Sequence, residues 1–188
     1  VGILNPSRGL MLVDGLDLKQ ASLEWWRMQI AYLPQEPSFL NATIRENVIM
    51  TCTQVDELRL AKVIQSVGLV KYLDESAEGL EAKITNNGAN LSLGIRHRIA
   101  LARALMSACK IAIFDEPTDG LDRDGIASVY SAMNNLSAQG CAIVVISHDP
   151  KFIKSASQVI DLSAKPIPRV SERTHKASDT SSAIIETP

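Results

Sequence analysis

The feature that most constrains the fold of this chain is an apolar run that ends in two carboxylates, Ile111-Ala112-Ile113-Phe114-Asp115-Glu116-Pro117. An apolar run without polar alternation predicts a strand buried on both faces of a parallel sheet. Asp115 and Glu116 follow at its carboxyl end, where open α/β sheets place their ligands. One carboxylate at this position can hold Mg²⁺ through water, and its neighbour can orient or deprotonate an attacking water. The motif is a candidate nucleotide-hydrolysis site, with an ordinary strand and turn as the structural alternative.

Bulk properties indicate one ordinary globular domain. The 188 residues are 46% hydrophobic and 21% charged, which is typical of soluble domains. A formal net charge of −2 gives no electrostatic reason to expect nucleic-acid binding. Cys52, Cys109 and Cys141 lack CxxC spacing, so free thiols are expected rather than a metal site or disulfides. No apolar run approaches the roughly 20 residues that cross a bilayer.

Strand patterns alternate with helix patterns along the chain, which predicts an α/β fold with a mostly parallel sheet. The helix-rich residues 39–88 lie between two predicted strands and are expected to form a lobe, placed at about 39–108 when the long helix is included. The expected strands are residues 10–13, 29–33, 111–115, 141–146 and 157–162. The expected helices begin at Ser22, Thr43, Thr53, Ser92, Asp122 and Asp149, with Thr53 to Asp56 taken as a capping box.

The two ends of the chain differ from its middle. Val1 to Leu4 resembles the last turn of a helix, so the chain is expected to be a fragment at its amino end. Residues 164–188 are rich in Ser, Thr and Pro with mixed charge. Such a segment has little apolar surface to offset its ordering entropy, which predicts a mobile tail and a domain over residues 1–163.

Several polar motifs follow the predicted elements in order, and together they resemble the nucleotide-binding domain of ATP-binding cassette (ABC) transporters, most closely the exporter type. The resemblance covers residues 1–162. Gln35 matches the Q-loop, and residues 37–47 match the exporter run that ends in T-I-R-E-N. Residues 90–98 match the LSGGQ signature. Asp115 and Glu116 match the Walker B pair, residues 118–122 match the D-loop, and His148 matches the switch histidine.

The resemblance implies a P-loop NTPase-like (RecA-like) α/β core with an inserted helical lobe, here without its amino-terminal strands. It implies ATP and Mg²⁺ as cofactors, with Asp115 and Gln35 holding the metal. Glu116 would polarise the attacking water, which His148 and Gln35 would position. Each residue also has a plainer interpretation on its own, because an exposed glutamine is usually solvated and a histidine after a buried strand is often structural.

The resemblance also assigns a second group of residues to nucleotide contacts across a dimer. A helix amino end presents free N–H groups and a positive dipole to phosphate, and Leu91, Ser92 and Gly94 open the long helix. In the family this signature faces the γ-phosphate held by a partner domain, and Asp122 adds contacts across the dimer. From the residues alone, Ser92 and Asp122 are equally explained as helix N-caps, and Gly94 as a turn glycine.

The family further implies the partners and the location. These are a second nucleotide-binding domain and a membrane domain, fused or separate, docked near Phe39 to Met50. The expected location is the cytoplasmic face of the plasma membrane, and no nucleic-acid partner is expected.

The sequence departs from the family pattern in several places. A phosphate loop, G-x-x-x-x-G-K-[S/T], supplies N–H groups, a lysine and a hydroxyl to nucleotide, yet no lysine follows a glycine here. We expect that this loop was cut off ahead of Val1. Leu93, Ile95 and His97 stand where Gly, Gln and Gln are usual, and Ile95 removes an amide whose hydrogen bond would contribute about 1.5–3 kcal/mol. Asn86 stands where exporters usually carry glutamate.

Two alternatives follow from these departures. The chain is either an active ATPase domain or an inactive subunit or remnant that lends its signature helix to a partner's ATP. The missing loop and Ile95 favour the second interpretation, whereas Asp115, Glu116 and His148 favour the first. An ABC ATPase acting on DNA or ribosomes is less consistent with the sequence, because repair-type relatives need a long coiled-coil insertion between Gln35 and Ser92.

Overall fold

The computed structural model describes residues 7–172, and the helix end expected at Val1 to Leu4 lies outside that range. Strands and helices alternate along most of it, as the sequence predicts. The helices are α1 (Leu23–Met28), α2 (Ile44–Ile49), α3 (Glu57–Ser66), α4 (Val70–Asp74), α5 (Leu93–Met106), α6 (Arg123–Ala138) and α7 (Pro150–Ser155), with 3-10 turns η1 (Gly79–Glu81) and η2 (Asn86–Gly88). The strands are β1 (Leu12–Val13), β2 (Leu16–Asp17), β3 (Ile30–Leu33), β4 (Ile111–Asp115), β5 (Ala142–Ile146), β6 (Gln158–Asp161) and β7 (Arg169–Glu172).

A three-stranded parallel sheet in the order β3-β4-β5 forms the centre of the fold. Its register places Ile30 opposite Ile111 and Ile111 opposite Ala142. Because all three strands run the same way, the segments that follow them emerge at one edge of the sheet. The predicted α/β class with a parallel sheet is therefore confirmed.

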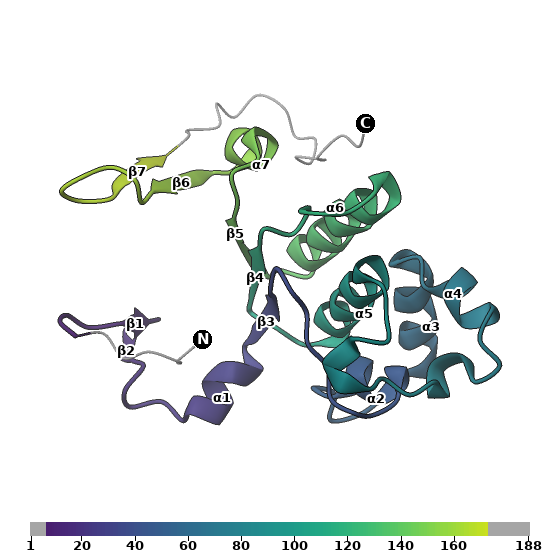
Figure 1. The fold of residues 1–188 in the computed structure, drawn as a ribbon. Helices are drawn as coiled ribbons and strands as arrows, with labels where there is room; N and C mark the ends of the chain where they lie inside the picture. Colours follow the sequence, from purple (N-terminus) through teal and green to yellow (C-terminus); the bar gives the residue numbers. More distant parts are fainter. Residues whose placement is uncertain (1–6, 173–188) are drawn as a thin grey trace.

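Helices α5 and α6 cover one face of this sheet (Figure 1). The residues that point to them include Ala31, Leu33, Ala112 and Phe114, all of them buried. Burying a large apolar side chain such as Phe114 stabilises the fold by about 1.5–3 kcal/mol. The same hydrophobic core continues into α2 and α3, which lie beside α5 (Figure 1).

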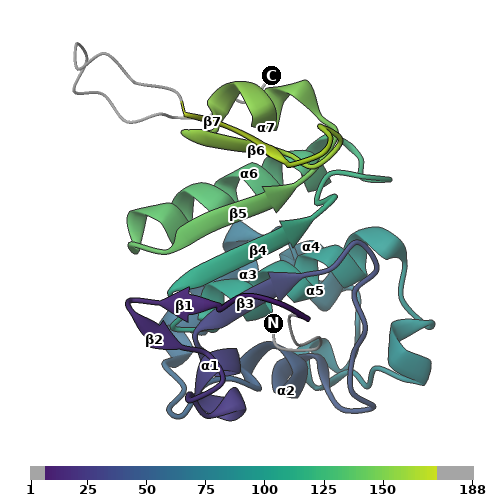
Figure 2. The same ribbon diagram turned by 90° about the vertical axis from the view of Figure 1, so that its left-hand side faces the viewer.

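The opposite face of the sheet is open, and Figure 2 shows it turned toward the viewer. No helix among residues 7–172 covers it. Along this face Tyr32 is 42% exposed, Val144 is 46% exposed and Ile146 is 52% exposed. The strands at 111–115 and 141–146 were expected to be buried on both faces, and this is wrong for the described range. An apolar sequence determines which residues share a face of the sheet, but not whether another segment covers that face.

Most helix starts agree with the sequence. Ser22, Thr43, Ser92 and Asp122 are all N-caps whose side chains accept a backbone N–H bond from the first turn. The start expected at Thr53 is wrong, because α3 begins after Asp56, whose carboxylate accepts the N–H groups of both Leu58 and Arg59.

Two antiparallel hairpins flank the sheet, β1 with β2 and β6 with β7. The strand expected at residues 157–162 is found as β6, but its partner is β7 rather than the parallel sheet. The tail expected from residue 164 contains β7, so regular structure extends beyond the expected boundary at 163. Residues 173–188 of that tail lie outside the described range.

Two further expectations are tested by the fold. In the described part of the chain, no helix is both long and apolar enough to span a bilayer. The three cysteines are free thiols, as expected; Cys141 is buried, and Cys52 and Cys109 are half-buried.

Candidate functional site

A pocket at the carboxyl edge of the sheet collects side chains from several loops. Its volume is about 580 Å³. It brings together the three predicted catalytic residues, Gln35 after β3, Glu116 after β4 and His148 after β5. The remaining lining residues are Thr118, Asp119, Gly120, Ser147 and Asp149.

Glu116 has the most constrained backbone in this pocket. Its φ is 42°, in the left-handed region that residues with a side chain seldom adopt. Its N–H donates to the carbonyl of Ile146 at 2.8 Å, which fixes the turn against the end of β5. Backbone strain of this kind is concentrated at functional sites.

The Glu116 carboxylate is held by two residues that follow β5. The Ser147 hydroxyl donates to Oε2 at 3.0 Å, and Nε2 of His148 lies 3.5 Å from Oε1. The Glu116 side chain keeps 23% exposure and that of His148 is fully exposed, so both reach solvent. Ser147 was missed by the sequence reasoning, and only its position beside His148 could have suggested it.

Asp115 lies one residue earlier, on the open face of the sheet. Its Oδ2 accepts a hydrogen bond from the Tyr32 hydroxyl at 3.3 Å, across the β3–β4 pairing. Partial burial, followed by the negative charge of Asp115, raises the pKa of Tyr32, so the phenol stays a hydrogen-bond donor at neutral pH. Tyr32 was also missed, because its link to Asp115 spans 83 residues.

Gln35 donates from Nε2 to Oδ2 of Asp119 at 3.1 Å. Asp119 lies in the turn between β4 and α6 and was not singled out from the sequence. The structure therefore joins Gln35 to the segment after Glu116 through a carboxylate that sequence reasoning did not use.

The oxygen donors of this edge suit a hard divalent cation. Asp115 and Glu116 supply carboxylates and Gln35 an amide, and Mg²⁺ is commonly held by one or two carboxylates together with water and substrate phosphates. Within residues 7–172 no three His, Cys, Asp or Glu side chains form a metal-binding group. The set therefore fits Mg²⁺ that arrives with a nucleotide, and does not form a complete cage.

The predicted phosphate-binding residues lie apart from the pocket lining, at the start of α5. Ser92 caps this helix, its Oγ accepting the Ile95 N–H at 3.4 Å. Leu91 is buried, and its N–H donates to the carbonyl of Gly88 at 2.9 Å. Asp122 accepts the Gly125 N–H at 2.7 Å and caps α6.

The start of α5 touches the turn that lines the pocket. A Cβ placed on Gly120 would lie 3.2 Å from Cδ2 of Leu93, and Gly120 has a φ of +67°, which disfavours residues with a side chain. Leu93 replaces the usual glycine of the signature, and here its side chain packs on the D-loop.

His97, another altered position of the signature, is only 1% exposed. Its Nδ1 lies 3.1 Å from the Leu93 carbonyl, and a carbonyl only accepts, so Nδ1 carries the hydrogen. Nε2 is buried without a hydrogen-bond partner in the described structure. Burial lowers the pKa of His97, partly offset by the bond to Leu93, so the ring is neutral.

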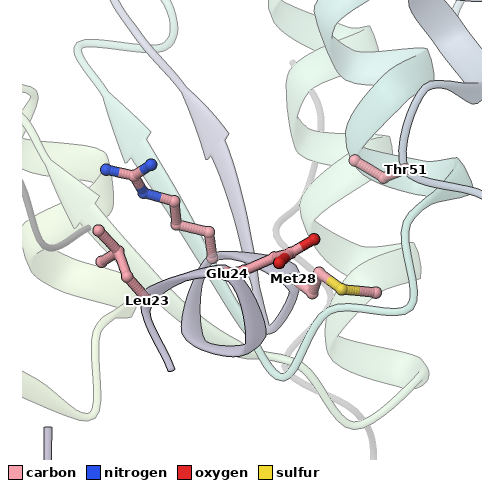
Figure 3. A pocket seen from close by; sticks show the side chains of 5 residues that line it. Leu23, Glu24, Met28 and Thr51 are labelled. Carbon is pink, nitrogen blue, oxygen red and sulfur yellow. The ribbon is translucent and has the colours of Figure 1, made fainter. Parts of the chain in front are cut away.

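A second hollow, of about 440 Å³, lies away from the carboxyl edge. It is formed by α1 and by Thr51, two residues after the end of α2, as Figure 3 shows for Leu23, Glu24, Met28 and Thr51. It contains none of the predicted site residues.

Known proteins resemble this chain in sequence and in structure. The family model described as "ABC transporter" matches residues 1–119. Proteins named "Leukotoxin translocation ATP-binding protein LktB", from Mannheimia haemolytica and from Bibersteinia trehalosi, are 35% identical over 155 residues, or 82% of this chain and 22% of each relative. The chain thus spans about a fifth of the length of these curated relatives.

A solved structure shows the same fold. It is titled "Structure of a bacterial Atm1-family ABC exporter with ATP bound", and it matches with a TM-score of 0.74 at 22% identity, over 83% of this chain and 27% of the other. Together with the family match, the ordered motifs and the parallel α/β core lead to one assignment. This chain belongs to the ABC transporter family, as part of its ATP-binding domain.

Proposed function

We propose that this chain binds and hydrolyses MgATP, as one of two paired domains that power an exporter-type ABC transporter. The observation that carries the proposal is the pocket in which Gln35, Glu116 and His148 meet at the carboxyl edge of the sheet. An amide, a carboxylate and an imidazole that converge on one solvent-accessible space are the groups that orient and activate a water.

Glu116 is the proposed general base. Its strained backbone and the Ser147 hydroxyl fix the carboxylate, which remains accessible to water. A carboxylate so held polarises a water and takes its proton as the water attacks the γ-phosphate. His148, in contact with Glu116, positions that water and the phosphate.

Asp115 and Gln35 are the proposed Mg²⁺ ligands, with Asp115 acting through water. Bound Mg²⁺ neutralises phosphate charge during phosphoryl transfer. Tyr32 orients the Asp115 carboxylate from the neighbouring strand. The oxygen chemistry of these side chains supports this assignment.

The triphosphate itself needs donors that these residues do not supply. We infer that a glycine-rich loop with a lysine comes from another part of the complete protein, since no lysine follows a glycine in this sequence. The start of α5, with Leu91, Ser92 and Gly94, would bind the γ-phosphate held by the partner domain through free N–H groups of the first turn, with Asp122 contacting the partner. Two domains would then enclose two nucleotides, and their closure and reopening would drive transport.

The membrane domain of the same transporter is the second proposed partner. Large apolar side chains are exposed around residues 39–50, among them Leu40 and Met50. Thr51, directly after this segment, helps to form the hollow beside α1 (Figure 3). This surface would place the chain at the cytoplasmic face of the plasma membrane. The net charge of −2 gives no support to a nucleic-acid partner.

A second candidate function is a non-catalytic subunit that contributes only its signature helix to a partner's ATP. Ile95 favours it, because an aliphatic side chain cannot replace the hydrogen bonds of the usual glutamine. A subunit of this kind needs the fold and the start of α5 to contact the partner's ATP, whereas it does not need Glu116, because it hydrolyses no ATP of its own.

The substitution Glu116→Gln separates the two functions when it is made in the complete transporter, which includes its phosphate loop. We expect ATP to be retained while hydrolysis falls at least a hundredfold, because glutamine keeps the shape but cannot take a proton. Trapped nucleotide and phosphate release are the measurements. Glu75→Gln, an exposed carboxylate after α4, is the matched control and should leave both unchanged. Undiminished turnover in Glu116→Gln would remove Glu116 as the base.

A further inference from the structure

The contact between Gln35 and Asp119 joins two loops that are far apart in sequence. Nε2 of Gln35 donates to Oδ2 of Asp119 at 3.1 Å, across 84 residues. Both side chains are exposed and both line the pocket that contains Glu116 and His148. A glutamine in such a place has no packing to choose one orientation of its amide.

The carboxylate of Asp119 determines the orientation of the Gln35 amide. An ionised carboxylate only accepts hydrogen bonds, so the nitrogen of the Gln35 amide must face it. The amide is planar, which directs its Oε1 away from the nitrogen and leaves that oxygen without a hydrogen-bond partner among residues 7–172. A hard cation, or the proton of a water, needs this oxygen and cannot use the nitrogen.

The backbone holds Asp119 in place for this role. Its N–H donates to the carbonyl of Glu116 at 3.2 Å, so the Asp119 carboxylate is carried on the turn that Glu116 begins. The next residue, Gly120, lies beside Leu93 at the start of α5, since a Cβ placed on it would come within 3.2 Å of Leu93 Cδ2. Asp119 is thereby fixed relative to Glu116 on one side and to the signature helix on the other.

We propose that Asp119 is a positioning residue, which orients the Gln35 amide so that its oxygen is available to the MgATP site. This inference rests on the proposed function. Asp119 itself touches neither metal nor nucleotide in this role, and acts through Gln35 alone.

The first test uses this chain without nucleotide, where activity plays no part. Asp119→Asn keeps the size of the side chain, but its amide can donate as well as accept, so it no longer selects one orientation of Gln35. We expect ¹⁵N relaxation of the Gln35 side-chain NH₂ group to show increased mobility in Asp119→Asn. Asp74→Asn, an exposed substitution at the end of α4, is the matched control and should match the wild type. An unchanged Gln35 signal in Asp119→Asn overturns the inference.

The second test uses the complete ATP-hydrolysing protein. In Asp119→Asn the Mg²⁺ concentration for half-maximal turnover should rise roughly three- to tenfold, as expected for the loss of one ordered hydrogen bond, while the KM for ATP stays within twofold. Asp119→Asn with the Mg²⁺ dependence of the wild type overturns the inference and leaves the proposed function intact. A wild-type protein that binds no nucleotide in the presence of Mg²⁺ overturns the proposed function itself.

Discussion

His97 is a polar side chain in a buried position, where desolvation of its ring costs free energy. Its ring is almost fully buried in α5 and has one hydrogen bond, to Leu93. Burial lowers its pKa below the ordinary value of 6.5. The folded state therefore binds fewer protons than the unfolded chain, so this residue makes the free energy of unfolding fall as the pH drops below about 6.5.

The substitution His97→Gln should remove this part of the pH dependence. Between pH 7 and pH 5 the wild type is expected to lose stability with a slope of up to about 1.4 kcal/mol per pH unit from this one group, and the variant should be flatter. Urea unfolding at several pH values measures the slope. The difference between the two proteins at pH 8, where the ring is neutral in both states, gives the packing contribution alone. Parallel curves from pH 8 to pH 5 would exclude His97 as the titrating group.

The sequence indicated which polar side chains meet at the carboxyl edge of the sheet, and it was less informative about the contacts that hold them. Gln35, Glu116 and His148 follow three parallel strands, and strand order alone brings them to one edge. Tyr32, Asp119 and Ser147 were not predicted, because each contacts its partner across 31 to 84 residues. Such contacts depend on register and loop shape, which no local pattern of residues encodes.

Helices α2 and α5 are joined by a polar junction inside the core. The Asn47 side chain is fully buried, and it donates to the carbonyls of Leu40 and Thr43 and accepts from the Leu40 N–H. Arg103 of α5 donates to the side chain and to the carbonyl of Asn47. Its guanidinium also lies 5.0 Å from the ring centroid of Phe39, a cation–π contact.

The substitution Asn47→Ala should weaken this junction strongly. It removes the hydrogen-bond acceptor of the Leu40 N–H and of Nη2 of Arg103, and each polar group left unpaired costs about 1–3 kcal/mol. We expect the free energy of unfolding to fall by about 3 kcal/mol in urea denaturation. Asn135→Ala, at an exposed position of α6, is the control and should change it by less than about 0.5 kcal/mol. Equal losses in the two variants would contradict a structural role for the junction.

Helix starts and strands were predictable from the sequence where neighbouring residues determine them. N-caps depend on one side chain and the next three N–H groups, so five of the six helix starts were found from the sequence, Asp149 before α7 among them. The remaining start was misplaced because two side chains three residues apart could both cap α3, and Asp56 is the one whose carboxylate accepts the first-turn N–H groups. Burial of a strand on its second face is not local. It depends on which segment covers that face, and this explains why β4 and β5 were expected to be more buried than they are.

The molecule as a whole has one covered and one open sheet face, and the chain spans about a fifth of the length of its curated relatives. On the open face, Tyr32 of β3, Ile113 of β4 and Val144 of β5 form a row across the three strands, and exposed Ile146 lies two residues further along β5. Contiguous exposed apolar surface of this kind is an interaction or aggregation site. The chain by itself should therefore self-associate through this face.

The paired substitution Val144→Thr with Ile146→Thr tests that expectation. Threonine keeps the β-branched shape that suits a strand, while its hydroxyl makes the exposed surface more polar. Sedimentation velocity over a range of concentrations should show less self-association than in the wild type. The free energy of unfolding should change by less than about 1 kcal/mol, because these side chains have little burial to lose.

Ile143→Thr is the matched control, since Ile143 directly precedes Val144 on β5 and packs against the core from the helix-covered side. Because side chains alternate along a strand, this variant should keep the association of the wild type and lose about 2 kcal/mol of stability through the missing apolar contacts and the buried hydroxyl. The opposite pattern, in which Ile143→Thr disperses the chain and the paired variant does not, would show that association proceeds through partial unfolding and not through the open face.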